Sequence, residues 1–217
     1  MINWVWFLVV PFISSFLVAV VVTPVVIGIY KSRKWLDDPK SKSHPKVVHT
    51  YPVPRGGGIP VLVAVGAMAV VLLGVDKYVM GILAGAVIIT IVGVVDDLKD
   101  LSPYWRLILG VGAAVCVVAS GIGIEFVSNP LGGIIRLDQW PIVADVFAVV
   151  WIVWLMNMVN WSKGVDGQLP GIVVIGAVTI PGIATFAPAI TDSVIAIGAA
   201  LVLFIVPFAW SPRGFAL

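Results

Sequence analysis

Charged side chains are scarce in this sequence: only 11% of its 217 residues are charged, and 60% are hydrophobic. A soluble domain of this size could not cover its surface with so few polar groups, so that class is excluded. Charges are absent from seven long stretches, which are residues 2–30, 56–75, 78–95, 107–124, 146–162, 167–191 and 193–212. Each stretch is long enough, or nearly so, for a helix that crosses a hydrocarbon layer of ~30 Å.

Cysteine, histidine and short alternating strands are also scarce, and each scarcity argues against one kind of structure or site. Cys116 is the single cysteine, so the chain makes no internal disulfide. The two histidines, His44 and His49, lie five residues apart in a loop without cysteine, which is poor evidence for a metal pair. Short alternating strands are also absent, and we therefore expect helices rather than a membrane barrel.

We predict an all-α polytopic membrane protein in which residues 1–217 form one membrane domain with about seven transmembrane helices. The first apolar stretch is too long for a signal peptide and has no basic flank before it, so it is expected to be retained. Tryptophans gather near the span ends, as an interfacial belt would place them. The predicted spans are Trp4–Tyr30, Ile59–Gly74, Tyr78–Val95, Leu107–Ile124, Pro141–Val159, Pro170–Phe186 and Ser193–Trp210.

Lysine and arginine are distributed unequally over this topology. Lys77 and Arg136 lie on one side, and the other eleven of the thirteen follow odd-numbered spans. Loops rich in lysine and arginine stay in the cytoplasm, so we predict that the N-terminus lies outside. The membrane is expected to be the cytoplasmic (inner) membrane. A basic inner face suits the lipid bilayer and phosphorylated substrates, and no nucleic acid is expected as a partner. Outside, the segment Glu125–Trp140 has two β-prone pieces that can form a small hairpin.

The stretch Val94–Pro103, VVDDLKDLSP, places Asp96, Asp97 and Asp100 directly after an apolar run. If the helix continues past the run, spacings of three and four bring these carboxylates onto one side. Crowded carboxylates at a membrane helix end favour a site that handles a cation, a cationic substrate or a proton. An acidic cap on a solvated helix end would use the same residues.

Two more loops on the same side carry chemistry. In the first, Arg55 precedes Gly56–Gly58, whose backbone amides can approach a phosphate where the second span begins. A basic loop attracted to anionic lipids is the alternative. In the third, Asn157 and Asn160 are one turn apart, and glycines surround Asp166, as in a broken helix that lines a polar cavity. An ordinary loop between spans is the alternative there.

All three loops follow odd-numbered spans and therefore share one face of the membrane. Carboxylates, amides, a basic arm and glycine turns can then converge on one cytoplasmic site. This combination predicts chemistry on a phosphorylated substrate held with a divalent cation, because Mg²⁺ commonly binds through one or two carboxylates plus substrate phosphates.

Together the loops resemble the polyprenyl-phosphate N-acetylhexosamine-1-phosphate transferases (glycosyl transferase family 4). This superfamily includes the phospho-N-acetylmuramoyl-pentapeptide and undecaprenyl-phosphate N-acetylglucosamine-1-phosphate transferases. The matching pieces are Asp37-Asp38-Pro39 and His49-x-x-Pro52-x-Pro54-Arg55-x-Gly57-Gly58 in loop one, Gly93-x-x-Asp96-Asp97 and Leu101-Ser102-Pro103 in loop two, and Asn157-x-x-Asn160 and Gly164-x-Asp166-Gly167 in loop three.

The resemblance implies a Mg²⁺-dependent enzyme of cell-wall or envelope polysaccharide synthesis. Undecaprenyl phosphate would attack the β-phosphorus of a UDP-N-acetylhexosamine, giving a lipid-diphospho-sugar and UMP. It implies catalytic and metal-binding roles for Asp96, Asp97 and Asp166, with Asp96 deprotonating the lipid phosphate or attacking the nucleotide. It also implies substrate contacts for His49, Arg55, Asn157, Asn160, Lys163, Gly164 and Gly167.

Three departures from the family pattern stand out. The segment between Pro39 and His49 is longer than usual, and Lys163 stands where the family usually has an aspartate. The chain stops at Leu217, before the spans that carry a Gly-Asp motif and a histidine-rich loop in family members. We therefore expect an N-terminal portion of a longer fold, which would not turn over alone.

Two other functions stay open. A non-catalytic relative that binds polyprenyl phosphate or organises envelope enzymes is favoured by Lys163 and by the position of the chain end. A secondary transporter also uses broken helices and intramembrane acids, but its site is expected near the midplane rather than at one face. The UDP-sugar, the polymer and assembly as a homodimer are left open.

Overall fold

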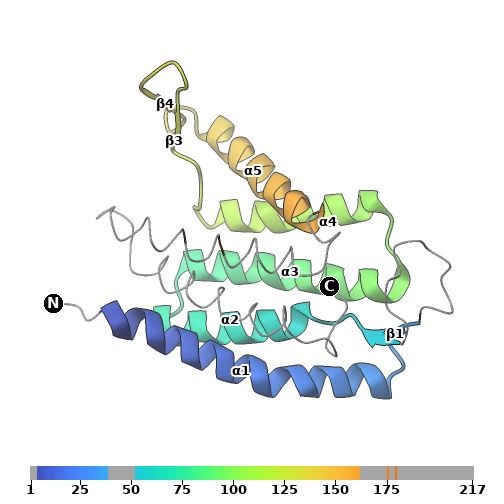
Figure 1. Cartoon of the computed structure of the whole chain (residues 1–217). Helices are drawn as coiled ribbons and strands as arrows, with labels where there is room; N and C mark the ends of the chain where they lie inside the picture. The colour runs from blue at the N-terminus through green and yellow to red at the C-terminus, as the bar shows by residue number, and fades with distance from the viewer. Residues whose placement is uncertain (1–3, 39–51, 162–174, 176–178, 180–217) are drawn as a thin grey trace. The chain divides into compact units, whose positions relative to one another are not determined.

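The computed structural model describes residues 4–38 and 52–161, together with Ile175 and Thr179 (Figure 1). These residues are mostly helical and fall into two compact units. The first unit contains the described residues up to Gly74 together with Asp97–Lys99, and the second contains Val75–Asp96 and Asp100–Trp161. Each unit is described below by itself.

The first unit is built on helices α1 (Trp4–Ser32) and α2 (Gly58–Leu73), which lie side by side (Figure 1). Ala19 of α1 and Ala64 of α2 form the buried centre of their contact. Small side chains at this contact let two helices approach closely, which is how membrane helices commonly pack. Buried residues recur along one stripe of α1, and they are Pro11, Ser15, Ala19, Val26 and Tyr30.

Helix α1 ends in a Schellman motif. The amide of Trp35 donates to the Tyr30 carbonyl at 2.9 Å, and the amide of Lys34 donates to the Lys31 carbonyl at 3.2 Å. Lys34 adopts the left-handed backbone conformation that this motif requires, with φ of 58°. The rings of Tyr30 and Trp35 meet edge to face, with centroids 5.5 Å apart, and so supply the hydrophobic contact that accompanies such motifs.

A two-stranded antiparallel sheet follows directly in the first unit. Strand β1 (Leu36–Asp37) pairs with β2 (Val53–Pro54), with Leu36 opposite Pro54 and Asp37 opposite Val53. Val53 is buried, and so are Pro54 and Gly56. This pairing holds the segment after α1 against the segment that leads into α2.

The second unit contains helix α3 (Lys77–Lys99) up to Asp96, together with α4 (Pro103–Ala119) and α5 (Pro141–Trp161). Gly81 and Gly85 of α3, four residues apart, face α4 so closely that added side chains would collide with Ser120 and Val117. This small-residue spacing is typical of tightly packed membrane helices. Gly110 of α4 similarly lies near Met156 of α5.

A hairpin connects α4 to α5. Strands β3 (Phe126–Ser128) and β4 (Ile134–Arg136) pair antiparallel, with Phe126 opposite Arg136. Its turn is closed by the amide of Gly132, which donates to the Asn129 carbonyl at 2.9 Å. The pairing falls within Glu125–Trp140, where the sequence indicated β-prone pieces, and its location outside the membrane stays a prediction.

Three described helical segments are long and apolar enough to cross a membrane: Ile13–Ser32, Lys77–Lys99 and Pro141–Trp161. Their apolar side chains are largely exposed; on α1, Leu17, Val21 and Val25 are more than half exposed at four-residue spacing. Exposed apolar faces of this kind suit contact with lipid. Helices α2 and α4 are apolar but shorter. The predicted spans Pro170–Phe186 and Ser193–Trp210 lie outside the described residues.

The fourth predicted span, Leu107–Ile124, was wrong at both ends, by four residues at its start and by five at its end. The fourth span was expected to begin at Leu107, after the charge of Arg106, but α4 begins at Pro103. Proline lacks an amide hydrogen and has its backbone fixed near helical values, so it suits the first turn of a helix. The helix ends at Ala119, before Gly121 in the left-handed region with φ of 97°.

Candidate functional site

The acidic stretch of the sequence lies at the end of α3. The helix continues past the apolar run to Lys99, as expected, so Asp96 and Asp97 lie on its last turns. Asp100 does not continue it: its backbone is left-handed, with φ of 48°, and its amide donates to the Asp96 carbonyl at 2.8 Å. Adjacent positions on a helix point about 100° apart, so Asp96 and Asp97 take different surroundings.

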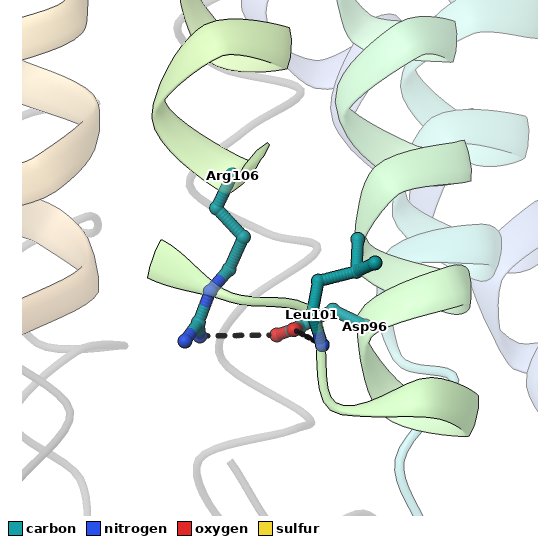
Figure 2. A network of polar contacts seen from close by, with 3 residues as sticks. All are labelled: Asp96, Leu101 and Arg106. Atoms are coloured by element: carbon teal, nitrogen blue, oxygen red, sulfur yellow. Dashed lines mark hydrogen bonds and ion pairs between the residues drawn. The ribbon is translucent and has the colours of Figure 1, made fainter. Parts of the chain in front are cut away.

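Asp96 holds the turn between α3 and α4, as Figure 2 shows. One carboxylate oxygen accepts from the Leu101 amide at 2.9 Å, and the other accepts from Nη1 of Arg106 at 3.2 Å. The ion pair is partly exposed, because the Arg106 side chain is 41% and the Asp96 side chain 24% accessible. Asp96 is therefore already fixed in orientation, by a cation and an amide from its own unit.

Asp97 faces a different set of residues, all in the first unit. Together with Leu98 it lines a pocket of about 170 Å³, whose other walls are Tyr30, Lys34–Asp37 and Arg55. The pocket therefore collects the end of α1, strand β1, the residue after β2 and the last turn of α3. Its lining residues include two cationic residues, two anionic residues and a tyrosine.

Asp37 and Arg55 form an ion pair inside this pocket. The Asp37 side chain is only 5% exposed, whereas that of Arg55 is 34% exposed. The antiparallel pairing of β1 with β2 brings the two residues together, because Asp37 lies opposite Val53, two residues before Arg55. Both residues belong to motifs that carry the family resemblance, but their contact could not be read from sequence spacing.

Gly56 lies against the ring of Tyr30. A β-carbon at this position would overlap the ring, so only glycine fits without displacing Tyr30. Gly56 is therefore required here for packing against Tyr30. The start of α2 has no side-chain cap on its first amides, and their approach to a phosphate stays a prediction.

The remaining predicted site residues are only partly described. Asn157 and Asn160 lie near the end of α5; the Asn157 side-chain amide donates to the Val153 carbonyl at 2.8 Å, and Asn160 is exposed. His49, Lys163, Gly164, Asp166 and Gly167 lie outside the described residues. Convergence of the third loop on the site therefore stays a prediction.

A metal site made only of protein ligands is not found in the part of the chain that the structure describes. No three histidine, cysteine, aspartate or glutamate side chains come together among those residues. Mg²⁺ usually keeps fewer protein ligands, with substrate phosphates completing its octahedron. Asp97 lines the pocket and has the chemistry of a carboxylate ligand for this second kind of site.

Comparison with known proteins identifies relatives of the chain. It is 31% identical over 175 residues to the probable undecaprenyl-phosphate N-acetylglucosaminyl 1-phosphate transferase of Bacillus subtilis (strain 168), covering 80% of this chain and 47% of that protein. It is 30% identical over 146 residues to the decaprenyl-phosphate N-acetylglucosaminephosphotransferase of Mycobacterium leprae (strain TN), covering 61% and 36%. The chain thus spans less than half the length of these relatives.

A family model covers most of the chain as well. The model of glycosyl transferase family 4 matches residues 79–213, which include the end of α3, the turn held by Asp96, and α5 with its two asparagines. The matched residues include the second and third loops, whereas the first loop lies before them. The chain belongs to glycosyl transferase family 4.

Proposed function

We propose that the protein transfers N-acetylhexosamine-1-phosphate from a UDP-sugar to undecaprenyl phosphate, releasing UMP. The observation that carries this proposal is the pocket at the end of α1, where Asp97 and Arg55 stand together in a chain of this family. The named relatives act on polyprenyl phosphates and N-acetylglucosamine phosphate, which supports the same substrate classes here.

In this reaction an oxygen of the lipid phosphate attacks the β-phosphorus of the UDP-sugar, and UMP leaves. The transfer depends on positioning and charge neutralisation more than on a strong base. Arg55 offers a fixed fork of donors for phosphoryl oxygens. Asp97 is the carboxylate beside the pocket that would hold Mg²⁺, and the ion would supply neutralisation of phosphoryl charge.

Asp96 has a separate role in this proposal. Held by Arg106 and the Leu101 amide, it fixes the turn that ends α3 and so sets the direction of its neighbour Asp97. A role as the base for the lipid phosphate requires it to exchange one of these partners when substrate binds. Asn157, Asn160 and Asp166 are proposed to contact the nucleotide.

We place the active face on the cytoplasmic side of the inner membrane. The three long apolar helices support a membrane protein, and the distribution of lysine and arginine supports the orientation. Seven spans and an outside N-terminus are parts of this proposal that the sequence alone supports, and assembly as a homodimer stays open.

A transfer assay tests the proposal. The full-length protein is purified in detergent and supplied with Mg²⁺, undecaprenyl phosphate and UDP-N-acetylglucosamine, or with UDP-N-acetylmuramoyl-pentapeptide, while UMP release is measured. Asp97→Asn and Asp166→Asn are expected to lower turnover by roughly a hundredfold or more, because a neutral amide cannot replace their charge. Asp96→Asn is expected to lower it as well, whereas Asp138→Asn on the surface leaves it unchanged. Near-normal turnover by all three acidic variants would place the site elsewhere.

A further inference from the structure

The hydroxyl of Tyr30 is a buried polar group that the fold does not use. Tyr30 is only 2% exposed, and its hydroxyl has no hydrogen-bond partner among the residues that the structure describes. Buried hydroxyls in folded proteins normally have a partner, and one left unsatisfied is unfavourable. The residue also lines the pocket that contains Asp97 and Arg55.

Packing does not explain why this residue is a tyrosine. The ring lies against Gly56 and meets Trp35 edge to face, and a phenylalanine ring would make both contacts. A phenylalanine would also avoid the unsatisfied oxygen. The hydroxyl therefore has a use only when something enters the pocket.

The other side chains of the pocket indicate what enters. Lys34, a cationic residue in a left-handed position that favours glycine, is one of the residues that line the pocket. Arg55 adds a second cation, paired with Asp37, and Asp97 adds a carboxylate. Hydroxyl and cationic donors together suit the oxygens of a phosphoryl group, and a carboxylate beside them suits a cation bound to that group.

The size of the pocket limits how much of the substrate enters. Its volume is about 170 Å³, which is several times the ~30 Å³ share of one water molecule. Sites for whole ligands are larger, at roughly 300–1,000 Å³. A pocket of this size suits one group of a substrate, such as a phosphoryl group, rather than the whole substrate.

We infer that Tyr30 is a substrate-binding residue whose hydroxyl donates a hydrogen bond to a phosphoryl oxygen in the pocket beside Lys34, Arg55 and Asp97. This inference rests on the proposed function, since both of its substrates carry phosphoryl groups. The phosphoryl group belongs either to the lipid phosphate or to the UDP-sugar, and the experiment separates these two sources.

Tyr30→Phe removes only the hydroxyl. Tyr78→Phe is the matched control, because Tyr78 is 43% exposed and lies at the start of α3, whereas Asp97 lies near the end of that helix. The full-length protein is titrated with undecaprenyl phosphate in one arm and UDP-N-acetylglucosamine in the other, both with Mg²⁺. Undecaprenol, which lacks the phosphate, is the ligand control. We expect Tyr30→Phe to raise the Kd about tenfold in one arm, which identifies the source. Tyr78→Phe leaves both values unchanged.

Thermal unfolding without ligand separates binding from a structural role. Because the hydroxyl is unsatisfied, Tyr30→Phe should unfold at the same or a higher temperature than the wild type. A lower unfolding temperature together with unchanged Kd in both arms would overturn the inference, as would a wild-type protein that binds neither phosphorylated ligand.

The proposed function is tested separately, by measuring the release of UMP. If UMP is released but Tyr30→Phe binds both substrates normally, the inference fails and the proposed function stands. If no UMP is released but binding of a phosphorylated ligand depends on the Tyr30 hydroxyl, the inference stands and the proposed function fails.

Discussion

At the scale of single residues, the ion pair of Asp37 with Arg55 is expected to affect stability because its carboxylate is buried. Asp37 is almost fully buried, so removing Arg55 takes away a cation that stabilises the buried carboxylate. Losing one partner of a buried pair typically costs ~3–5 kcal/mol, and the partial exposure of Arg55 reduces this to about 2 kcal/mol. We expect Arg55→Ala to lower the free energy of unfolding by that amount, measured by denaturant unfolding in detergent.

The pair of Arg136 with Asp138 is the control for this measurement. Both side chains are exposed, at 67% and 38%, so Arg136→Ala should cost less than about 1 kcal/mol. A double-mutant cycle with Asp37→Asn isolates the coupling between Asp37 and Arg55. Equal losses for Arg55→Ala and Arg136→Ala would show that burial adds nothing to the first pair.

Gly56 gives a second prediction at this scale. Gly56→Ala places a methyl group in the Tyr30 ring, so the ring or the segment before α2 must move. We expect a loss of ~1–3 kcal/mol, as for other overpacked sites, and weaker binding of phosphorylated ligand. Gly28→Ala in α1 is the control, because nothing lies within 4 Å of a β-carbon there. If both variants unfold alike in thermal denaturation, the ring does not constrain Gly56.

At the scale of elements, apolar runs were enough to predict where helices lie but not where they end. The run Tyr78–Val95 located α3, whose extension to Lys99 depends on the left-handed Asp100 that caps it. The Schellman end of α1 places a lysine where sequence rules prefer glycine, so nothing marked it in advance. The contacts of Asp96 with Arg106, ten residues away, depend on that same turn geometry.

The packing of α3 on α4 gives a prediction that uses Cys116. Gly85→Leu would push its side chain into Val117 and the Ala113 carbonyl, which lie 2.9 Å and 3.1 Å from the position of a β-carbon. We expect the two helices to separate, with a loss of ~1–3 kcal/mol. Cys116, the single cysteine and partly buried, should then react several-fold faster with a small thiol reagent in detergent.

Gly93→Leu is the matched control on the same helix, since nothing lies within 4 Å of a β-carbon there. It should leave the labelling rate of Cys116 close to that of the wild type. Equal rates for both leucine variants would show that α3 does not cover α4 through Gly85.

At the scale of the whole molecule, the sequence predicted the class and the family but not the construction of the pocket. The motif residues Asp37, Arg55 and Asp97 were each visible, and the family resemblance implied a substrate role for Arg55. These three residues line one pocket because β1 pairs with β2 next to the end of α1. Such contacts join residues that are far apart in the sequence, so the sequence did not reveal them. Tyr30 was missed because its signal is a buried hydroxyl without a partner, and burial cannot be read from a residue in an apolar run.

The topology is the prediction on which the position of the site depends. The three loops can share a face only if odd-numbered spans end in the cytoplasm, as eleven of thirteen basic residues indicate. Single cysteines at Lys42, Lys99 and Lys163 in a Cys116→Ala background should therefore be shielded from an impermeant thiol reagent in intact cells. A cysteine at Asp138, beside the β3–β4 hairpin, should be labelled.

Permeabilised cells supply the control for this experiment, because all four cysteines should react once the reagent can cross the membrane. Position 99 is decisive, since Lys99 ends α3 two residues after Asp97. Labelling there in intact cells would place the acidic turn outside, away from any cytoplasmic nucleotide sugar. A shielded Lys99 with an accessible Lys163 would instead separate the third loop from the pocket, and the nucleotide contacts proposed for Asn157, Asn160 and Asp166 would have to be abandoned.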